Sequence, residues 1–72
     1  MNDWSKQIDQ HLDHLFHFAL SKTKNRSLSL DLVQDTIVSA IEKKDGFEGR
    51  SSLRTWLTSI LNRKIIDHWR KV

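Results

Sequence analysis

The residues of this sequence with the clearest chemical potential include an acidic group in the middle of the chain. Asp31, Asp35 and Glu42 are interspersed with Gln34 and Val38 at spacings of three and four residues. On a helix this spacing forms one continuous face, acidic with an apolar residue inside it. Two interpretations fit such a face: a solvated surface, or a docking surface for a basic partner helix, with Val38 as the apolar contact and carboxylates that steer association.

Basic residues form a second group toward the C-terminus, where a nucleic-acid strand is the partner that they suit. Cations neutralise phosphates, and exposed aromatic side chains such as Phe47 and Trp69 can stack on bases for about 1–3 kcal/mol each. The alternative is packing, with Phe47 as an anchor that caps the core and Trp69 as a cover over a helix end. The basic residues of this group are Arg50, Arg54, Arg63, Lys64, Arg70 and Lys71.

His11, His14 and His17 recur at three-residue steps. Residues three apart on a helix are rotated by about 60° from alignment, and no carboxylate or Cys completes a metal site around them. We therefore expect no metal, and predict that these histidines make the first helix more cationic below about pH 6.5. No nucleophile triad, paired-acid pattern or phosphate-binding glycine loop stands out, so we also expect no enzymatic activity, cofactor or small-molecule substrate.

The elements that must position these groups belong to one small domain, residues 1–72. A chain of this length buries only about 60% of its extended surface, which leaves little room for an enclosed catalytic pocket. The absence of Cys excludes disulfides and the usual zinc sites with Cys ligands. No apolar run approaches a membrane span and no signal peptide is present, so we expect a cytoplasmic protein that does not contact a membrane.

Hydrophobic spacing predicts an all-α fold, a small bundle of three to four helices. The first helix is expected from Ser5 to Lys22. The second begins near Ser29 and ends around Lys43 and Lys44, and the third begins after a cap at Ser51 or Ser52 and runs to the end of the chain. The expected core residues are Trp4, Ile8, Leu12, Leu15, Phe16, Ala19, Leu30, Val33, Ile37, Ala40, Ile41, Leu53, Trp56, Leu57 and Ile60. Ile65, Ile66 and Trp69 are expected to point away from the core face, as if the last helix leaves the core.

Three segments, in this order and spacing, resemble the second conserved region of extracytoplasmic-function sigma factors of bacterial RNA polymerase. They are Asp31 to Asp35 (DLVQD), Phe47 to Leu57 (FEGRSSLRTWL) and Ile65 to Lys71 (IIDHWRK). The resemblance extends from about Leu15 to Lys71. It implies a compact helical domain that is not an enzyme and that takes part in promoter recognition and melting.

The resemblance also implies a role for each group of residues. Asp31, Gln34, Asp35 and Val38, with Glu42 on the same face, would bind the clamp coiled coil on the largest catalytic subunit of the RNA polymerase core. The loop would hold a flipped base of the non-template strand of the minus-ten promoter element, through Phe47, Glu48, Gly49, Arg50, Ser51 and Ser52. Arg63, Lys64, Asp67, Arg70 and Lys71 would lie along that single strand. An anti-sigma factor is a further implied partner.

The sequence departs from the family in two places. Family members carry Asn seven residues after the Trp of the Thr-Trp-Leu motif, where this chain has Arg63 and places Asn62 one position earlier. One residue on a helix is a rotation of about 100°, so either Arg63 takes over the strand contact or Asn62 plays a different part. The domain that recognises the minus-thirty-five element is absent from this chain, which we therefore expect to be an excised domain or a fragment.

Two other functions remain open from the residues. An autonomous regulator that binds duplex DNA would need a recognition helix after a tight turn of three or four residues, which the six-residue loop 45–50 fits poorly. A helical bundle that binds only proteins would use its basic end for solubility alone.

Overall fold

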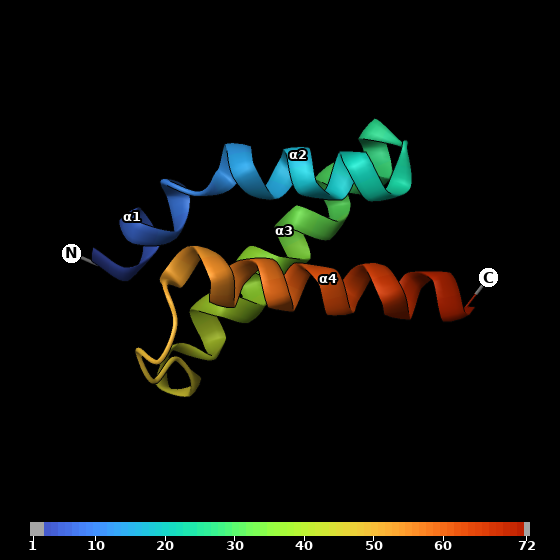
Figure 1. The fold of residues 1–72 in the computed structure, drawn as a ribbon. Helices are drawn as coiled ribbons and strands as arrows, with labels where there is room; N and C mark the ends of the chain where they lie inside the picture. Colours follow the sequence, from blue (N-terminus) through green and yellow to red (C-terminus); the bar gives the residue numbers. More distant parts are fainter. Residues whose placement is uncertain (1–2, 72) are drawn as a thin grey trace.

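Residues 3–71 are described by a computed structural model, in which four α-helices and one short 3₁₀ helix follow one another (Figure 1). The helices are α1 (Asp3–Asp9), α2 (Leu12–Thr23), α3 (Arg26–Glu42) and α4 (Leu53–Lys71), and the 3₁₀ helix η1 (Lys44–Gly46) follows α3. No strand occurs among these residues. The predicted all-α bundle is confirmed. No helix within residues 3–71 is both long enough and apolar enough to cross a membrane.

The single first helix predicted from Ser5 to Lys22 is wrong, because the chain breaks at Gln10 and His11. The His11 amide donates to the carbonyl of Ile8 at 2.9 Å, three residues back, where an α-helix bonds four back. The break lets α1 turn, so that Trp4 and Ile8 are buried against α3 and α4. The Trp4 indole N–H donates to the carbonyl of Ala40 at 3.1 Å. Leu12, expected in the core, is instead exposed.

α3 begins three residues before the predicted start at Ser29. Asn25 is the N-cap, and its side-chain oxygen accepts from the Leu28 amide at 3.0 Å. Ser29 is fully buried; its hydroxyl donates to the Asn25 carbonyl at 2.7 Å and lies 2.8 Å from the Thr23 hydroxyl. The predicted end near Lys43 is confirmed, since α3 ends at Glu42 with Lys43 as its C-cap.

The buried face of α3 is rotated relative to the prediction. Leu30 and Ile41, expected in the core, are 45% and 42% exposed. Val33 and Ala40 are buried as expected, and Ile37 is partly buried. The remaining buried positions are Ser29, Leu32 and Thr36. Small hydroxyl side chains can be buried here because they hydrogen-bond within their own helix, as the Thr36 hydroxyl does to the Leu32 carbonyl at 2.8 Å.

α4 starts as predicted and stays in the core longer than predicted. Ser52 caps it, since its hydroxyl accepts from the Thr55 amide at 3.1 Å. Leu57, Leu61 and Ile65 are buried at four-residue steps on one face. The expectation that Ile65 points away from the core is therefore wrong, whereas it is confirmed for Ile66 and Trp69, which are exposed.

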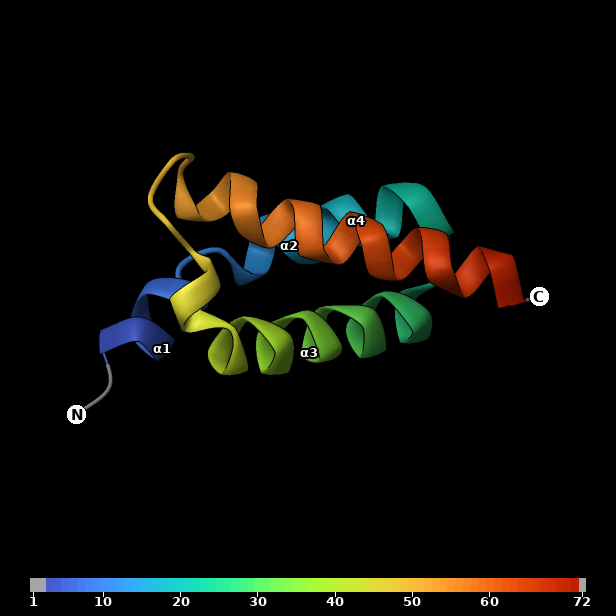
Figure 2. The same ribbon diagram turned by 90° about the horizontal axis from the view of Figure 1, so that it is seen from below.

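The helices pack as three mutually contacting rods, with α1 at one end. α3 contacts both α2 and α4, and α2 also contacts α4 (Figures 1 and 2). Trp4 of α1 reaches the loop that leads into α4, where its ring centroid lies 5.7 Å from that of Phe47. At the other end the last turn of α4 extends past the α2–α3 connection. The outer surfaces of α3 and α4 therefore remain available for partners.

Candidate functional site

The outer face of α3 carries every residue of the predicted protein-docking surface. Asp31, Gln34, Asp35 and Glu42 are exposed, and Val38 is 55% exposed. Leu30 and Ile41 are exposed on the same helix, and at 100° per residue they fall within about 80° of Val38. The face thus combines an apolar strip with a carboxylate edge. Sequence reasoning missed Leu30 and Ile41 as surface residues because hydrophobicity alone placed them inside.

The loop between η1 and α4 is anchored by Phe47. The centroid of its ring lies 5.1 Å from that of Trp56 and 5.7 Å from that of Trp4, and Trp4 and Trp56 are 5.8 Å apart. The interpretation of Phe47 as an anchor that caps the core is therefore confirmed. Gly49 has a φ of 75°, which favours glycine. The other residues of the predicted base pocket, from Glu48 to Ser52, are exposed.

Arg50 and Glu48 form an ion pair across this loop, with 3.3 Å between the Arg50 Nε and a Glu48 carboxylate oxygen. Both side chains are well exposed, so the pair contributes at most about 1 kcal/mol to stability. A nucleic-acid phosphate can therefore compete for the Arg50 guanidinium with little loss of stability.

One groove runs along the C-terminal half of α4 and gathers several of the predicted DNA contacts. Both Asn62 and Arg63 line it, so the structure brings together the two residues between which the sequence left the strand contact open. Trp69, 49% exposed, packs edge-on against His68 with 5.5 Å between ring centroids. Lys64 and Lys71 lie on the same helix outside the groove lining. The residues that line this α4 groove are Ser59, Asn62, Arg63, Ile66, Asp67 and Arg70.

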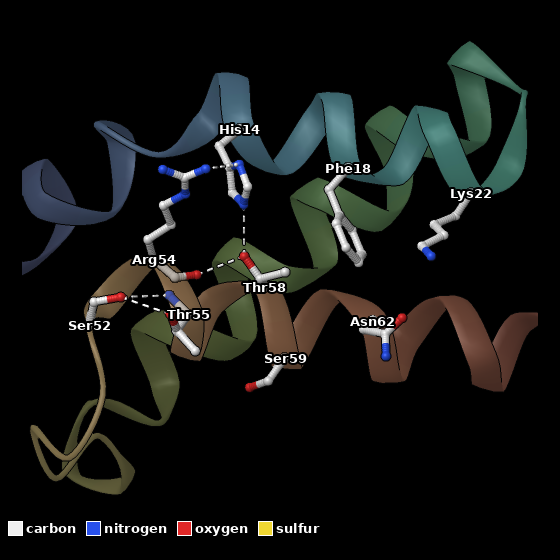
Figure 3. A pocket seen from close by; sticks show the side chains of 9 residues that line it. All are labelled: His14, Phe18, Lys22, Ser52, Arg54, Thr55, Thr58, Ser59 and Asn62. Carbon is white, nitrogen blue, oxygen red and sulfur yellow. Dashed lines mark hydrogen bonds between the residues drawn. The ribbon is translucent and has the colours of Figure 1, made fainter.

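A second groove lies between α2 and α4 (Figure 3), and the predictions for α2 did not include it. Its walls come from segments about 40 residues apart in sequence, a juxtaposition that no local pattern reveals. Asn62 and Ser59 line both grooves. The lining of this α2/α4 groove is His14, Phe18 and Lys22 from α2, and Ser52, Arg54, Thr55, Thr58, Ser59 and Asn62 from α4 and its cap.

His14 crosses from α2 to α4 at one end of this groove (Figure 3). The Thr58 hydroxyl donates to the Arg54 carbonyl at 2.7 Å, so it must accept from the His14 Nε2–H, 3.1 Å away. His14 Nδ1 then accepts from an Arg54 Nη2–H at 3.0 Å. The neutral imidazole with its proton on Nε2 satisfies both bonds. Protonation of Nδ1 would place two N–H donors, one from His14 and one from Arg54, opposite each other.

The pKa of His14 is lowered from its ordinary value by partial burial first, then by the positive charge of Arg54 and by the neighbouring His11 and His17. The expectation that all three histidines make this helix cationic below about pH 6.5 is therefore wrong for His14, which stays neutral to lower pH. No three His, Cys, Asp or Glu side chains in residues 3–71 are placed to hold a metal ion.

The sequence of the chain matches a known protein family. The sequence profile of the Sigma-70 region 2 family matches residues 7–72. The chain is 35% identical over 63 residues to the ECF RNA polymerase sigma factor SigX of Bacillus subtilis, covering 88% of this chain and 32% of that protein. It is 32% identical over 62 residues to the RNA polymerase sigma factor YlaC of the same organism, covering 86% and 36%.

A probable RNA polymerase sigma factor of Haemophilus influenzae is also 32% identical over 65 residues, which cover 90% of this chain and 34% of that protein. No solved structure matches the chain significantly. The chain spans about a third of the length of the curated relatives that it matches. Since the family profile matches nearly the whole chain, this protein belongs to the Sigma-70 region 2 family of RNA polymerase sigma factors.

Proposed function

We propose that this domain acts in transcription initiation as part of a sigma factor, with one surface for RNA polymerase and another for promoter DNA. The observation that carries the proposal is the separation of two chemically different surfaces on two helices. The outer face of α3 is acidic and apolar. Helix α4, by contrast, carries five cationic side chains against the single acid Asp67: Arg54, Arg63, Lys64, Arg70 and Lys71. Such a role would place the protein in the cytoplasm, bound to the polymerase.

The outer face of α3 would bind the clamp coiled coil of the largest catalytic subunit. Burial of apolar side chains drives association, and Leu30, Val38 and Ile41 are the exposed apolar side chains of this face. The carboxylates of Asp31 and Asp35 beside this strip would steer a basic partner helix and fix its orientation. From family membership we add an anti-sigma factor as a further partner.

The α4 groove and the loop would bind the non-template single strand of the minus-ten element. Arg63 and Arg70 line the groove, where they would contact phosphates, and the ring of Trp69, which is 49% exposed, would stack on a base. Phe47 supports this site by holding the loop in place, so the base pocket of the family would be formed by the polar residues Glu48 to Ser52. Base extrusion costs a few kcal/mol, which stacking and phosphate contacts would offset.

The decisive test of the proposal is binding to the isolated clamp coiled coil of RNA polymerase. We expect wild type to bind and Asp35→Lys to lose at least about tenfold in affinity, which corresponds to about 1.4 kcal/mol. Asp9→Lys is the matched control, because Asp9 is also exposed but ends α1. No binding by folded wild type, or equal losses in both variants, would refute the polymerase contact.

A second measurement compares single-stranded and duplex minus-ten DNA. We expect the domain to prefer the single strand, and the double variant Arg63→Gln with Arg70→Gln to bind that strand more weakly than wild type. Preference for duplex would favour an autonomous DNA-binding regulator. Unchanged DNA affinity after neutralisation of both arginines would favour a domain that binds only proteins.

A further inference from the structure

The α2/α4 groove has a cation at each end. Arg54 lies at one end beside His14, and Lys22 lies at the other, with Phe18 between them on the α2 wall (Figure 3). Hydroxyl groups and the Asn62 amide line the opposite wall. The part of the chain that the structure describes contributes no carboxylate to this lining. The groove therefore offers positive charge and hydrogen-bond donors, which is the chemistry that a phosphate backbone requires.

The positive charges at the two ends are not neutralised within the domain. Arg54 bonds to His14, a neutral group that orients the guanidinium without cancelling its charge. The Lys22 ammonium lies 5.5 Å from the centroid of the Phe18 ring, a contact that also leaves its charge uncompensated. Among residues 3–71 the only ion pair within 4.0 Å joins Arg50 and Glu48.

This groove is continuous with the α4 groove, because Ser59 and Asn62 line both. Together the two grooves follow α4 from its cap at Ser52 to Arg70. At a rise of about 1.5 Å per residue, this track is about 27 Å long. A strand with the ~3.4 Å spacing of stacked nucleotides would need roughly eight nucleotides to follow it.

We propose that a nucleic-acid single strand on α4 continues into the α2/α4 groove, where Lys22 and Arg54 each bind a phosphate. α2 thereby forms a second wall of the DNA site, and its contacts are to the backbone and independent of base sequence. This inference rests on the proposed function and adds to it a binding surface on a different helix. His14 is a positioning residue, which holds the Arg54 guanidinium at the groove end.

The test is the salt dependence of binding of this 72-residue chain to a fluorescent single-stranded oligonucleotide of minus-ten sequence. Each phosphate contact to a single strand adds ~0.7 to the slope of log affinity against log salt. When salt is raised from about 50 to 200 mM, both proteins lose affinity, and the factor lost by Lys22→Gln should be about 2.6 times smaller than the factor lost by wild type. For Lys22→Gln with Arg54→Gln, the fall should be about sevenfold smaller.

Lys6→Gln is the matched control, since it removes the same charge from an exposed position on α1 that lines neither groove. Circular dichroism verifies that each variant is folded. The inference is overturned if Lys22→Gln and Lys6→Gln share the wild-type slope while Arg63→Gln with Arg70→Gln lowers it, a result that leaves the proposed function intact. Absence of any single-strand binding by folded wild type at low salt would overturn both.

Because Lys22→Gln changes a charge at an exposed site, loss of folding cannot account for a reduced slope in that variant. For the positioning role of His14, the readout is rescue: His14→Gln, whose amide can still accept from Arg54, should retain the slope. His14→Leu should lower it by about the ~0.7 of one contact. Equal slopes for wild type and His14→Leu would refute the positioning role.

Discussion

Phe47 provides the most demanding test of how the loop before α4 is held. Its ring packs against both Trp4 and Trp56, which also contact each other, and each aromatic pair contributes about 0.5–1.5 kcal/mol beyond burial of area. Full burial of a Phe side chain contributes about 1.5–3 kcal/mol, and Phe47 is only partly buried. We therefore expect Phe47→Ala to lower the free energy of unfolding by about 2–4 kcal/mol.

Such a loss is large beside the ~4–11 kcal/mol expected for the total stability of a domain of this length. At about 4–8 °C per kcal/mol, thermal denaturation followed by circular dichroism should show a Tm at least about 8 °C lower. Phe47→Leu, which keeps most of the volume, should lose about half as much. Leu30→Ala controls for removal of an exposed apolar side chain and should change stability by less than about 1 kcal/mol.

The packing argument would be refuted by a Phe47→Ala variant as stable as wild type. If that variant also bound single-stranded DNA more weakly, Phe47 would act as a stacking platform for a base instead of an anchor. A variant that is destabilised but binds DNA normally at low temperature would leave base contacts to the polar residues of the loop.

Three further outcomes are expected. Asn25→Ala removes the side-chain cap of α3 and should lower the free energy of unfolding in urea by about 1 kcal/mol, with exposed Ser27→Ala near neutral. An added Cβ meets open space at both glycines, so the backbone conformation decides: Gly49→Ala should cost about 1–2 kcal/mol at a φ of 75°, whereas Gly46→Ala, at a position without positive φ, should not. Folding lowers the pKa of His14, so the stability that neutral His14 contributes is full above pH 6.5 and is lost as pH falls through the lowered pKa. His14→Gln should therefore flatten the pH dependence of Tm in this range.

The outer face of α3 and the start of α4 are the features that sequence reasoning predicted best. Both rest on local rules: charged residues at helical spacing share a face, and a serine before an apolar repeat caps a helix. Asp35 and Ser52 accordingly lie where they were expected, exposed on α3 and at the cap of α4.

The break between α1 and α2 could not be predicted in the same way. Neither Gly nor Pro marks it, and the apolar residues from Trp4 to Ala19 continue at helical spacing across Gln10 and His11. The break accompanies burial of Trp4 against α3 and its hydrogen bond to the Ala40 carbonyl, 36 residues away. Contacts of that range outweigh the local preference for one continuous helix.

The sequence by itself determined the helical class, the family motifs and the two charged surfaces, because each depends on residues close together in the chain. The tertiary structure alone decided which side of α3 is buried, since Ser29, Thr36 and Ala40 face inward as small residues that permit close packing while Leu30 and Ile41 are left outside. It also decided that His14, Lys22 and Arg54 line one groove. A groove between two helices depends on the relative orientation of the helices, and the packing of the whole core sets that orientation.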